Sequence, residues 1–347
     1  MHGKPRILIV GCGGIGGVIA TLMAQGDTAS VHVLSTNIHI ANAVRTNGIQ
    51  LSGVGGNVSA TINVHTEPPD ERFDFVLLAT QPPQVEAAAR SVLSTMTDKS
   101  RMVVLQNGLC ESRVAKICGA DRVVGGIVTF GASTNGPGEI ERTSSGGILL
   151  GRIDGKPDPQ VDILAAALAP IGPIEQTSNL MGARFSKLAL NCAVSGLGTV
   201  AGVRLGTLLG WAKARNVALG VMAEAVAVSQ AEAIQLEAVG GTFDLNWLAN
   251  PDASGSGPSH WSRHAMLMAV GFKYRKLRSS MLRAIEHGRE PAVDFLNGEI
   301  VTRGEAHGLM TPINRSIVEL VHQIAQGRIQ PSPTHLDGLA LHLEPKS

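Results

Sequence analysis

Residues 6–34, RILIVGCGGIGGVIATLMAQGDTASVHVL, decide the fold of the first half of the chain. The apolar run Arg6–Val10 predicts a strand, the apolar spacing of Ile15–Gln25 predicts a helix, and Val31–Leu34 predicts a second strand. Between the first strand and the helix stands GCGGIG, residues 11–16, which has the glycine spacing of a dinucleotide-binding turn. Because a strand precedes the motif and a helix follows it, the motif is stronger evidence than its spacing alone.

Each glycine of this turn has a separate task. Gly11 permits a tight turn, Gly13 lets the backbone approach a pyrophosphate, and Gly16 lets the helix pack closely against the strand. The helix then offers free N–H groups and the positive end of its dipole to phosphates. The alternative is a plain glycine-rich strand-to-helix turn. The predicted cofactor-binding residues here are Gly11, Cys12, Gly13, Gly14, Ile15 and Gly16.

The residues after the second strand bear on the choice of nucleotide. A site for NAD usually places Asp or Glu there to bind the ribose hydroxyls, whereas this chain reads Leu34-Ser35-Thr36-Asn37. An acid would repel a 2′-phosphate, and the hydroxyls of Ser35 and Thr36 can donate hydrogen bonds to one. The sequence therefore favours NADP(H). Arg45 is the next cation along the chain, and it either reaches back to this site or is a solvated helix residue.

Strand and helix patterns alternate over the rest of the first half. This alternation predicts an α/β fold with a doubly wound parallel sheet. Gly48–Val64 predicts strands and turns without a full crossover helix, and Glu139–Arg142 with Gly147–Leu150 predicts a hairpin. Further predicted strands are Phe75–Ala79, Met102–Leu105, Val123–Thr129 and Ile174–Thr177, and further predicted helices are Val85–Leu93, Glu111–Ile117 and Pro157–Leu168.

The character of the sequence changes at about residue 181, where long helical patterns begin. They cover residues 183–200, 212–237, 261–287 and 291–324 with breaks, and Asn250–Pro258 predicts a loop. We expect a dinucleotide-binding domain over 1–180, an all-helical substrate or dimerisation domain over 181–327, and an irregular tail over 328–347.

Composition excludes several classes of protein. The 347 residues carry a net charge of +1 and only 3% aromatic residues, so no basic surface for nucleic acid is expected. The four cysteines form no CxxC pair, which indicates structural thiols in a reduced, cytoplasmic compartment and predicts no metal site. No secretory leader is visible, and the apolar stretch 187–204 contains Asn, Ser, Thr and Gly, so we expect a buried helix and no membrane span.

Lys187 and Asn191 are the candidate catalytic pair. They lie four residues apart and share one face of an otherwise apolar predicted helix. Reduction of a carbonyl needs hydride at carbon and a proton or cation at the developing oxyanion. A partly buried amine supplies either, and Asn191 can bind substrate or hold Lys187 in place. The alternative is a lysine whose stem packs along the helix, beside an amide at a helix end.

Two other polar positions complete the candidate site. Asn107, in LQNG at 105–108, follows a predicted strand, and ligands gather at the carboxyl ends of parallel strands. Asn-Gly is also simple turn chemistry. Ser279 and Ser280 can bind a carboxylate, or they can hydrogen-bond their own helix backbone.

Taken in order, these motifs resemble the ketopantoate reductase (2-dehydropantoate 2-reductase) family over about residues 5–325. The resemblance rests on GCGGIGG at 11–17, LQNG at 105–108, KLALN at 187–191, SSML at 279–282, VDFLNG at 293–298 and TP at 311–312. Ile15 fits this family better than the related hydroxyacid dehydrogenases. The resemblance implies a Rossmann-like domain, a 6-phosphogluconate-dehydrogenase-like helical domain that often forms homodimers, and NADPH-dependent reduction of ketopantoate to pantoate in pantothenate biosynthesis.

The resemblance also implies roles for individual residues. Lys187 is the general acid that protonates the ketone oxygen, Asn191 binds the substrate, and Ser280 holds its carboxylate. Asn107 contacts the cofactor ribose or the substrate. Gln84 matches a family glutamine near the adenosine or ribose side of the cofactor.

The chain departs from the family pattern at four positions. Thr36 stands where the family has arginine, and Gln81 stands where the family has lysine. We still count Gln81 among the predicted cofactor-binding residues. Leu277 replaces a substrate-facing asparagine, and Ala292 replaces the glutamate that partners the catalytic lysine. The last two changes bear on the substrate, because an unpaired buried polar group costs about 1–3 kcal/mol. Asp294 cannot fully replace that glutamate if its segment is helical, since positions two apart do not share a face.

Three functions remain open at this point. The first is ketopantoate reduction with NADPH. The second is action on another small oxo or hydroxy compound in a pocket rebuilt around Leu277 and Ala292. The third is nucleotide binding or sensing without catalysis, which would not require an acid such as Lys187.

Overall fold

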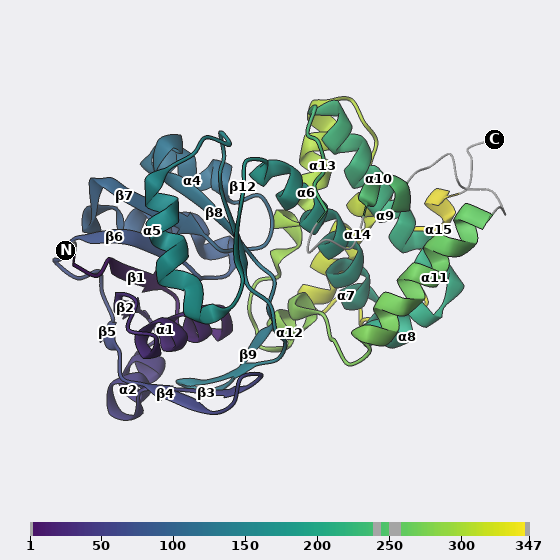
Figure 1. Ribbon diagram of the computed structural model, residues 1–347. Coiled ribbons are helices and arrows are strands. Elements are labelled where there is room, and N and C mark those ends of the chain that lie inside the picture. The colour runs from purple at the N-terminus through teal and green to yellow at the C-terminus, as the bar shows by residue number, and fades with distance from the viewer. Residues whose placement is uncertain (1–2, 239–243, 250–257, 344–347) are drawn as a thin grey trace. The chain divides into compact units, whose positions relative to one another are not determined.

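The protein is described from a computed structural model that covers residues 3–238, 244–249 and 258–343 (Figure 1). Two compact units divide the chain, Met1–Leu180 and Met181–Ser347. The loop predicted over Asn250–Pro258 lies outside the described residues except for Pro258, where a helix begins.

The N-terminal unit is built on an eight-stranded sheet with the order β12-β11-β8-β7-β6-β1-β2-β5. Neighbouring strands are parallel except β11 and β8, so the predicted doubly wound parallel sheet is confirmed with one antiparallel pair. The chain runs from β1 to β2 on one side and later to β6 on the other, so the strand order reverses between β1 and β6. The strands are β1 (Arg6–Val10), β2 (Ser30–Leu34), β5 (Asn63–His65), β6 (Phe73–Leu78), β7 (Met96–Val104), β8 (Val123–Val128), β11 (Ile148–Arg152) and β12 (Ile174–Thr177).

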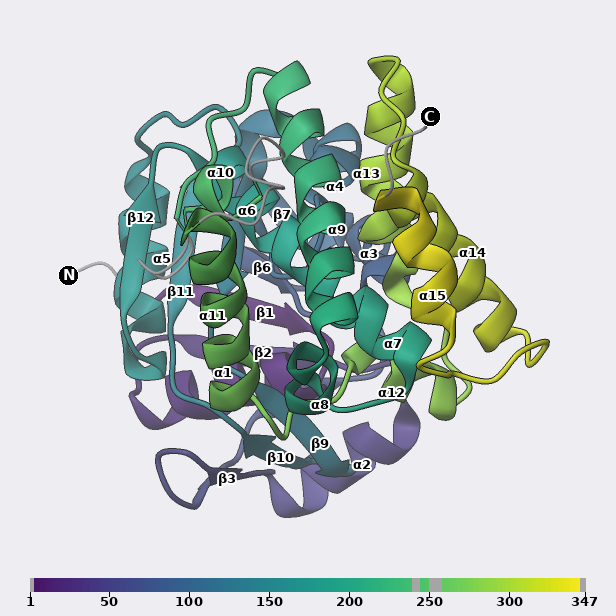
Figure 2. The same ribbon diagram turned by 90° about the vertical axis from the view of Figure 1, so that its right-hand side faces the viewer.

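Helices cover both faces of this sheet, because the central strands are apolar on both sides. Ile7 and Ile9 of β1 join α1 and α5 in one buried cluster, while α3 packs on β6 and α4 on β7 and β8. Figures 1 and 2 show α1 and α5 on one side of the strands and α4 on the other. The helices are α1 (Gly14–Gln25), α2 (Ile38–Asn47), α3 (Val85–Ser91), α4 (Glu111–Cys118) and α5 (Pro159–Leu168).

A second, four-stranded sheet has the order β4-β3-β10-β9 and packs against α1. It contains β3 (Ile49–Gly53), β4 (Val58–Ala60), β9 (Ala132–Gly136) and β10 (Glu139–Arg142). The strands and turns predicted over Gly48–Val64 are confirmed. The predicted hairpin is wrong, because β10 pairs with β9 and β3 whereas β11 pairs with β8 and β12. Gly138, at φ 77°, lets the chain turn tightly from β9 into β10.

The C-terminal unit is helical throughout the part that the structure describes. The helix predicted over 183–200 contains a π-helical turn, η5 (Cys192–Gly196), and the patterns at 261–287 and 291–324 are broken into shorter helices. Ser279 caps one of the new starts, and Pro312 opens another. The helices are α6 (Leu180–Asn191), α7 (Leu197–Ala201), α8 (Leu205–Gly210), α9 (Ala212–Ala231), α10 (Leu245–Leu248), α11 (Pro258–Lys273), α12 (Ser280–Glu286), α13 (Asn297–Ala306), α14 (Pro312–Ala325) and α15 (His335–Ala340), with 3-10 turns η8 (Ala292–Phe295) and η9 (Leu341–Leu343).

Residues 335–343 are more ordered than their sequence suggests. Residues after Gly327 were expected to be irregular, but α15 forms there and packs against α9 and α7. Leu336 and Leu339, three apart on one helix face, are both buried, which supplies the apolar contact that a short helix needs. No helix in the described ranges has the length and apolar character that a membrane span requires.

Candidate functional site

The glycine turn between β1 and α1 leaves space above it for a ligand. Gly11 has φ 106°, and a Cβ on it would stand 3.0 Å from the backbone of Ala79. A Cβ on Gly16 would stand 2.0 Å from the carbonyl oxygen of Gly11, so the helix start touches the turn itself. A Cβ on Gly13 would meet nothing within 4 Å. Gly11 and Gly16 therefore allow the close approach of backbone that forms the turn, whereas Gly13 faces free space.

The first turn of α1 suits an anion. Gly13 occupies its N-cap without a capping side chain from the described residues, and no acid stands in the first turn. The backbone N–H groups at a helix start have no partners within the helix and carry the positive end of its dipole. These features fit the pyrophosphate of a dinucleotide. The assignment of Gly11, Cys12, Gly13, Gly14, Ile15 and Gly16 as cofactor-binding residues stays a prediction.

The neighbouring strand ends lie beside this turn, at the point where the strand order reverses. The N–H of Ala79, after β6, donates to Val10 O at 2.9 Å, and that of Leu105, after β7, donates to Leu78 O at 3.2 Å. Gln106 Nε2 donates to Thr80 Oγ1 at 3.1 Å. In doubly wound sheets, ligands bind outside the carboxyl ends of the strands at such a switch point.

Three predicted residues lie at this edge of the sheet. Asn107 is exposed after β7 and is followed by Gly108 at φ 93°. Gln81 and Gln84 are exposed at the start and end of the short 3-10 turn Pro82–Gln84 after β6. Their side chains are accessible to a ligand at the switch point. Whether each one contacts a cofactor stays a prediction.

The end of β2 presents hydroxyls and an amide. Ser35 is buried and its N–H donates to His65 O at 2.9 Å, while Thr36 is exposed. Asn37 caps α2 by accepting from His39 N at 3.0 Å and Ile40 N at 3.3 Å. Arg45 is exposed and donates to Asn42 Oδ1 at 3.0 Å and to Val64 O at 3.5 Å.

In the C-terminal unit, Lys187 and Asn191 lie one turn apart on α6 and are both half-buried. Their neighbours Leu188, Ala189 and Cys192 are buried. Asn191 Nδ2 is buried, and none of the described residues accepts a hydrogen bond from it. A buried amide donor without a partner is costly, so this atom is suited to a ligand's acceptor.

The two serines of SSML have different environments. Ser279 is buried and caps α12, accepting from Leu282 N at 3.3 Å and donating to Ser195 O at 2.9 Å. Ser280 is the first residue of α12 and is exposed. The backbone-bonding alternative therefore holds for Ser279, while Ser280 remains available to a ligand.

Two of the four departures from the family pattern, Leu277 and Ala292, lie in the same unit. Leu277 is 48% exposed in the segment between α11 and α12. Ala292 is half-buried at the start of η8. Asp294 pairs with His322, its Oδ1 2.9 Å from Nε2. Asp294 is thus engaged at the surface, and whether it replaces the missing glutamate in part stays a prediction.

Sequence reasoning missed the buried polar contacts around η5. Thr199 Oγ1 lies 2.7 Å from Ser279 Oγ, and Asn297 Nδ2 donates to Cys192 O at 3.3 Å. One signal was present in the sequence, because Lys187, Asn191, Ser195 and Thr199 recur every four residues in an apolar stretch.

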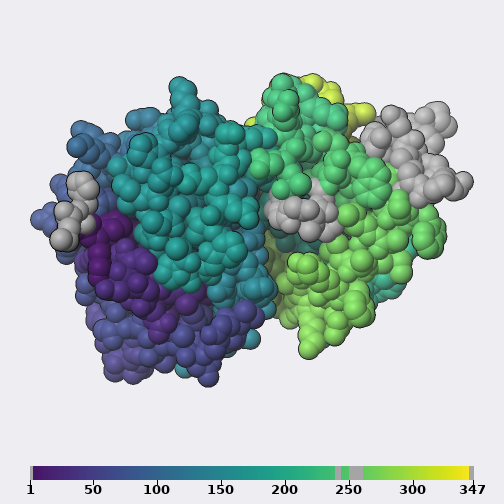
Figure 3. Space-filling model, in the orientation of Figure 1, coloured from purple at the N-terminus to yellow at the C-terminus, as the bar shows by residue number. Residues whose placement is uncertain are grey.

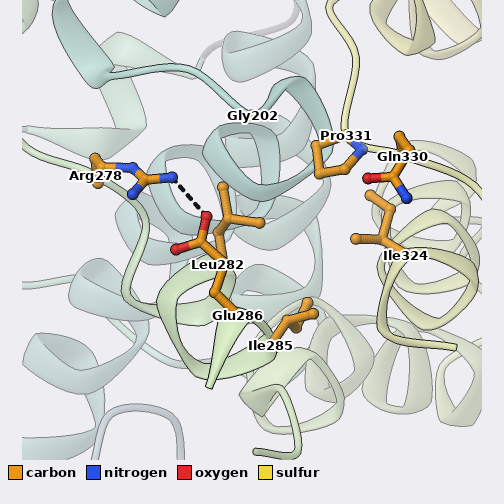
Figure 4. Close-up of a pocket in the computed structure, with 8 residues that line it drawn as sticks. All are labelled: Gly202, Arg278, Leu282, Ile285, Glu286, Ile324, Gln330 and Pro331. Carbon is orange, nitrogen blue, oxygen red and sulfur yellow. Dashed lines mark hydrogen bonds and ion pairs between the residues drawn. The ribbon is translucent and has the colours of Figure 1, made fainter. Parts of the chain in front are cut away.

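The C-terminal unit also has an open pocket of about 330 Å³ beside α12 (Figure 4). Arg278 and Glu286 form an ion pair of 2.7 Å on one side of it, and Leu282 and Ile285 supply apolar surface. None of the predicted catalytic or substrate-binding residues lines this pocket, so we assign it no part in the reaction.

Thiol and metal chemistry find no support in the described residues. All four cysteines are buried, and burial raises the pKa of Cys12 to about 11 and also raises that of Cys192. A buried thiol with a raised pKa is a poor nucleophile. Within the described ranges, no three His, Cys, Asp or Glu side chains are grouped as metal ligands.

Comparison with known proteins covers nearly the whole chain. The 2-dehydropantoate 2-reductase of Archaeoglobus fulgidus is 25% identical over 324 residues, which are 93% of this chain and 98% of that protein. The enzyme of the same name from Caulobacter vibrioides is 28% identical over 327 residues, 92% of this chain and 99% of its own.

Solved structures share the fold. A PanE/ApbA family ketopantoate reductase from Ralstonia eutropha superposes with a TM-score of 0.79 at 22% identity, covering 93% of this chain and 99% of that one. A D-mandelate dehydrogenase with NADH and anilino(oxo)acetate gives the same TM-score at 21% identity and the same coverage.

Two family models account for both units. The model "Ketopantoate reductase PanE/ApbA" matches residues 7–155, and "Ketopantoate reductase PanE/ApbA C terminal" matches residues 179–325. The chain therefore belongs to the ketopantoate reductase PanE/ApbA family of oxidoreductases.

Proposed function

We propose that this protein reduces a 2-oxo acid to the 2-hydroxy acid with NADPH, and that 2-dehydropantoate is its substrate. The observation that carries the proposal is the pair on α6: Lys187 beside Asn191, whose buried Nδ2 finds no acceptor in the described part of the chain. The relatives named 2-dehydropantoate 2-reductase support the choice of substrate.

Each side chain has a simple task in this reaction. The cofactor supplies hydride to the carbonyl carbon. Lys187 donates a proton to the ketone oxygen, where negative charge develops, and Asn191 donates a hydrogen bond to the substrate. The hydroxyl of Ser280 binds the carboxylate. Gly11, Gly13 and Gly16 hold the pyrophosphate against the start of α1.

The proposed nucleotide is NADPH, and the alternative is NADH, the nucleotide of the D-mandelate dehydrogenase structure. Thr36 is exposed after β2, and its neighbours in the chain, Ser35 and Asn37, are not acidic, so neither of them repels a 2′-phosphate. We expect NADPH to bind at least about tenfold more tightly than NADH.

A negative charge at this position tests the assignment. Thr36→Asp is expected to weaken NADPH by about tenfold or more and to leave NADH within about threefold, because like charges brought together are costly. Thr46→Asp, on the exposed side of α2, is the matched control. Kd values from fluorescence titration give the comparison, and equal binding of both nucleotides to the unaltered protein would refute NADPH preference.

One assay separates the candidate functions. Oxidation of NADPH by the pure protein is followed with 2-dehydropantoate and with a panel of other 2-oxo acids. Turnover on 2-dehydropantoate supports the proposal. Turnover on another oxo acid alone favours a pocket altered at Leu277 and Ala292. Tight NADPH binding without turnover on any compound would favour the third function, nucleotide binding or sensing without catalysis.

We further propose that the protein is cytoplasmic and forms a homodimer through its helical unit. Large apolar side chains stand exposed on α11: Trp261 at 77%, Met268 at 52% and Phe272 at 73%. The space-filling view shows residues of this part of the chain, in green, at the surface (Figure 3). Contiguous exposed apolar groups favour association, and sedimentation velocity is expected to give the mass of a dimer.

A further inference from the structure

The helix that carries Lys187 and Asn191 does not continue regularly, because the π-helical turn η5 follows Asn191 directly. Such turns are rare and occur frequently at functional sites. In η5, two backbone carbonyls, those of Cys192 and Ser195, accept hydrogen bonds from side chains elsewhere in the unit. None of these contacts takes part in the chemical steps of the proposed reaction.

The first contact comes from the start of α12. Ser279 Oγ donates to Ser195 O at 2.9 Å, lies 2.7 Å from Thr199 Oγ1 and accepts from Leu282 N at 3.3 Å. Thr199 Oγ1 also lies 2.8 Å from Ser195 O, so both hydroxyls face this carbonyl. Whichever hydroxyl donates to Ser195 O, the other can donate to it in turn, and Leu282 N donates to Ser279. Thr199 is fully buried and Ser279 is 7% exposed, so water does not substitute for these bonds.

The second contact comes from the start of α13. Asn297 is fully buried, and its Nδ2 donates to Cys192 O at 3.3 Å and to Asn314 Oδ1 at 2.9 Å. A Cβ on Gly196 would stand 2.9 Å from Asn297 Oδ1, so the turn and this amide fit each other only with glycine at 196.

The amide of Asn297 is itself held by a buried carboxylate. Asn314 Nδ2 donates to Glu224 Oε2 at 2.6 Å, and Glu224 also accepts from the N–H groups of Ile313 and Asn314 at 2.8 and 2.9 Å. Glu224 on α9 thereby caps α14. The contact to Cys192 O is therefore anchored in two further helices.

The turn affects which way Asn191 points relative to the residues after it. In a regular α-helix, each step of four residues drifts by about 40° around the axis. A π-helical turn advances less per residue, so the four residues from Asn191 to Ser195 fall short of a full revolution and do not overshoot it. Asn191 and Ser195 thus stay on one side of the helix. The hydrogen bond from Ser279 to Ser195 O joins the turn to the start of α12, where Ser280 is the next residue.

We propose that Ser279, Thr199 and Asn297 are positioning residues that hold η5 so that Asn191 and Ser280 address two ends of one substrate. We call these three side chains the π clamp. The proposal rests on the function proposed for Asn191 and Ser280. None of the three clamp residues needs to touch the substrate, because each acts through the helix starts and the turn that it joins.

Matched substitutions at Thr199 separate a hydrogen-bonding role from packing. Thr199→Val removes the hydroxyl and keeps the shape, whereas Thr199→Ser keeps the hydroxyl and removes a buried methyl group. Thr199→Val and Ser279→Ala are expected to raise KM for the oxo acid by about tenfold, with kcat changed less and NADPH affinity unchanged. Thr199→Ser is expected to retain the KM of the unaltered protein even if its Tm falls.

Two further comparisons complete the test. In an Asn191→Ala background, Ser279→Ala is expected to add less than about twofold to KM, because the clamp acts through a side chain that is already absent. The exposed Thr302→Val and the surface substitution Ser316→Ala, both in the same unit, serve as controls expected to leave KM and kcat unaltered.

The outcomes distinguish this inference from the proposed function. The inference is overturned if Thr199→Ser raises KM as much as Thr199→Val does. It is also overturned if the effects of Ser279→Ala and Asn191→Ala on KM are fully additive in the double variant. If the unaltered protein turns over no 2-oxo acid, the proposed function fails. Hydrogen exchange then tests whether the π clamp holds η5. Faster exchange at amides 192–199 in Ser279→Ala then supports it, and unchanged exchange overturns it.

Discussion

Replacing Lys187 with alanine is expected to lower kcat for oxo-acid reduction by about 10²- to 10⁴-fold, the usual contribution of a positioned general acid. The change removes the proton donor from α6 while the glycine turn that holds the pyrophosphate belongs to the other unit. NADPH affinity is therefore expected to stay within about threefold, so kcat and kcat/KM fall together. Steady-state kinetics and fluorescence titration of NADPH give the two quantities.

A matched lysine controls for loss of charge. Lys213 is exposed on α9 and pairs with Asp337, and Lys213→Ala is expected to keep full activity. Near-normal kcat in Lys187→Ala would assign the proton to another donor.

The N-terminal unit was the more predictable part of the chain. Several of its strands, such as β1, β6 and β8, are largely apolar runs, and each predicted run forms a strand. The polar strand β9, ASTNG, was not predicted, and the hairpin between Glu139–Arg142 and Gly147–Leu150 was wrong. Local sequence shows that two strands are close along the chain, but pairing depends on which sheet offers a free edge, and this is a tertiary property.

The sequence could propose residues for the candidate site, but it could not predict the contacts that hold those residues in place. Lys187 and Asn191 were visible because polar residues four apart stand out in an apolar helix. The π-helical turn, the capping of α14 by Glu224 and the buried Asn297 were not visible, since each depends on a residue distant in sequence. The sequence also showed that Leu277 and Ala292 depart from the family pattern.

Substitutions in the glycine turn are expected to have the other large effect. Gly13→Ala and Gly16→Ala should both weaken NADPH binding, but for different reasons. Gly13 has φ −87° and ψ −164°, which alanine adopts readily, and a Cβ there meets no atom within 4 Å. Gly13→Ala is therefore expected to fold with an unchanged Tm. The added methyl group occupies the space proposed for the pyrophosphate, so NADPH Kd should rise by about 10- to 100-fold.

Gly16→Ala is expected to act on the fold first. Its Cβ would stand 2.0 Å from Gly11 O and 3.1 Å from Ala79 Cβ, and the backbone oxygen can move only if α1 shifts away from β1. Forcing such a shift in a packed core costs about 3 kcal/mol or more, so the Tm of the N-terminal unit should fall and NADPH binding should be lost with it. Thermal denaturation with and without NADPH separates the two variants. If Gly13→Ala binds NADPH as tightly as the unaltered protein, the pyrophosphate does not lie over this turn.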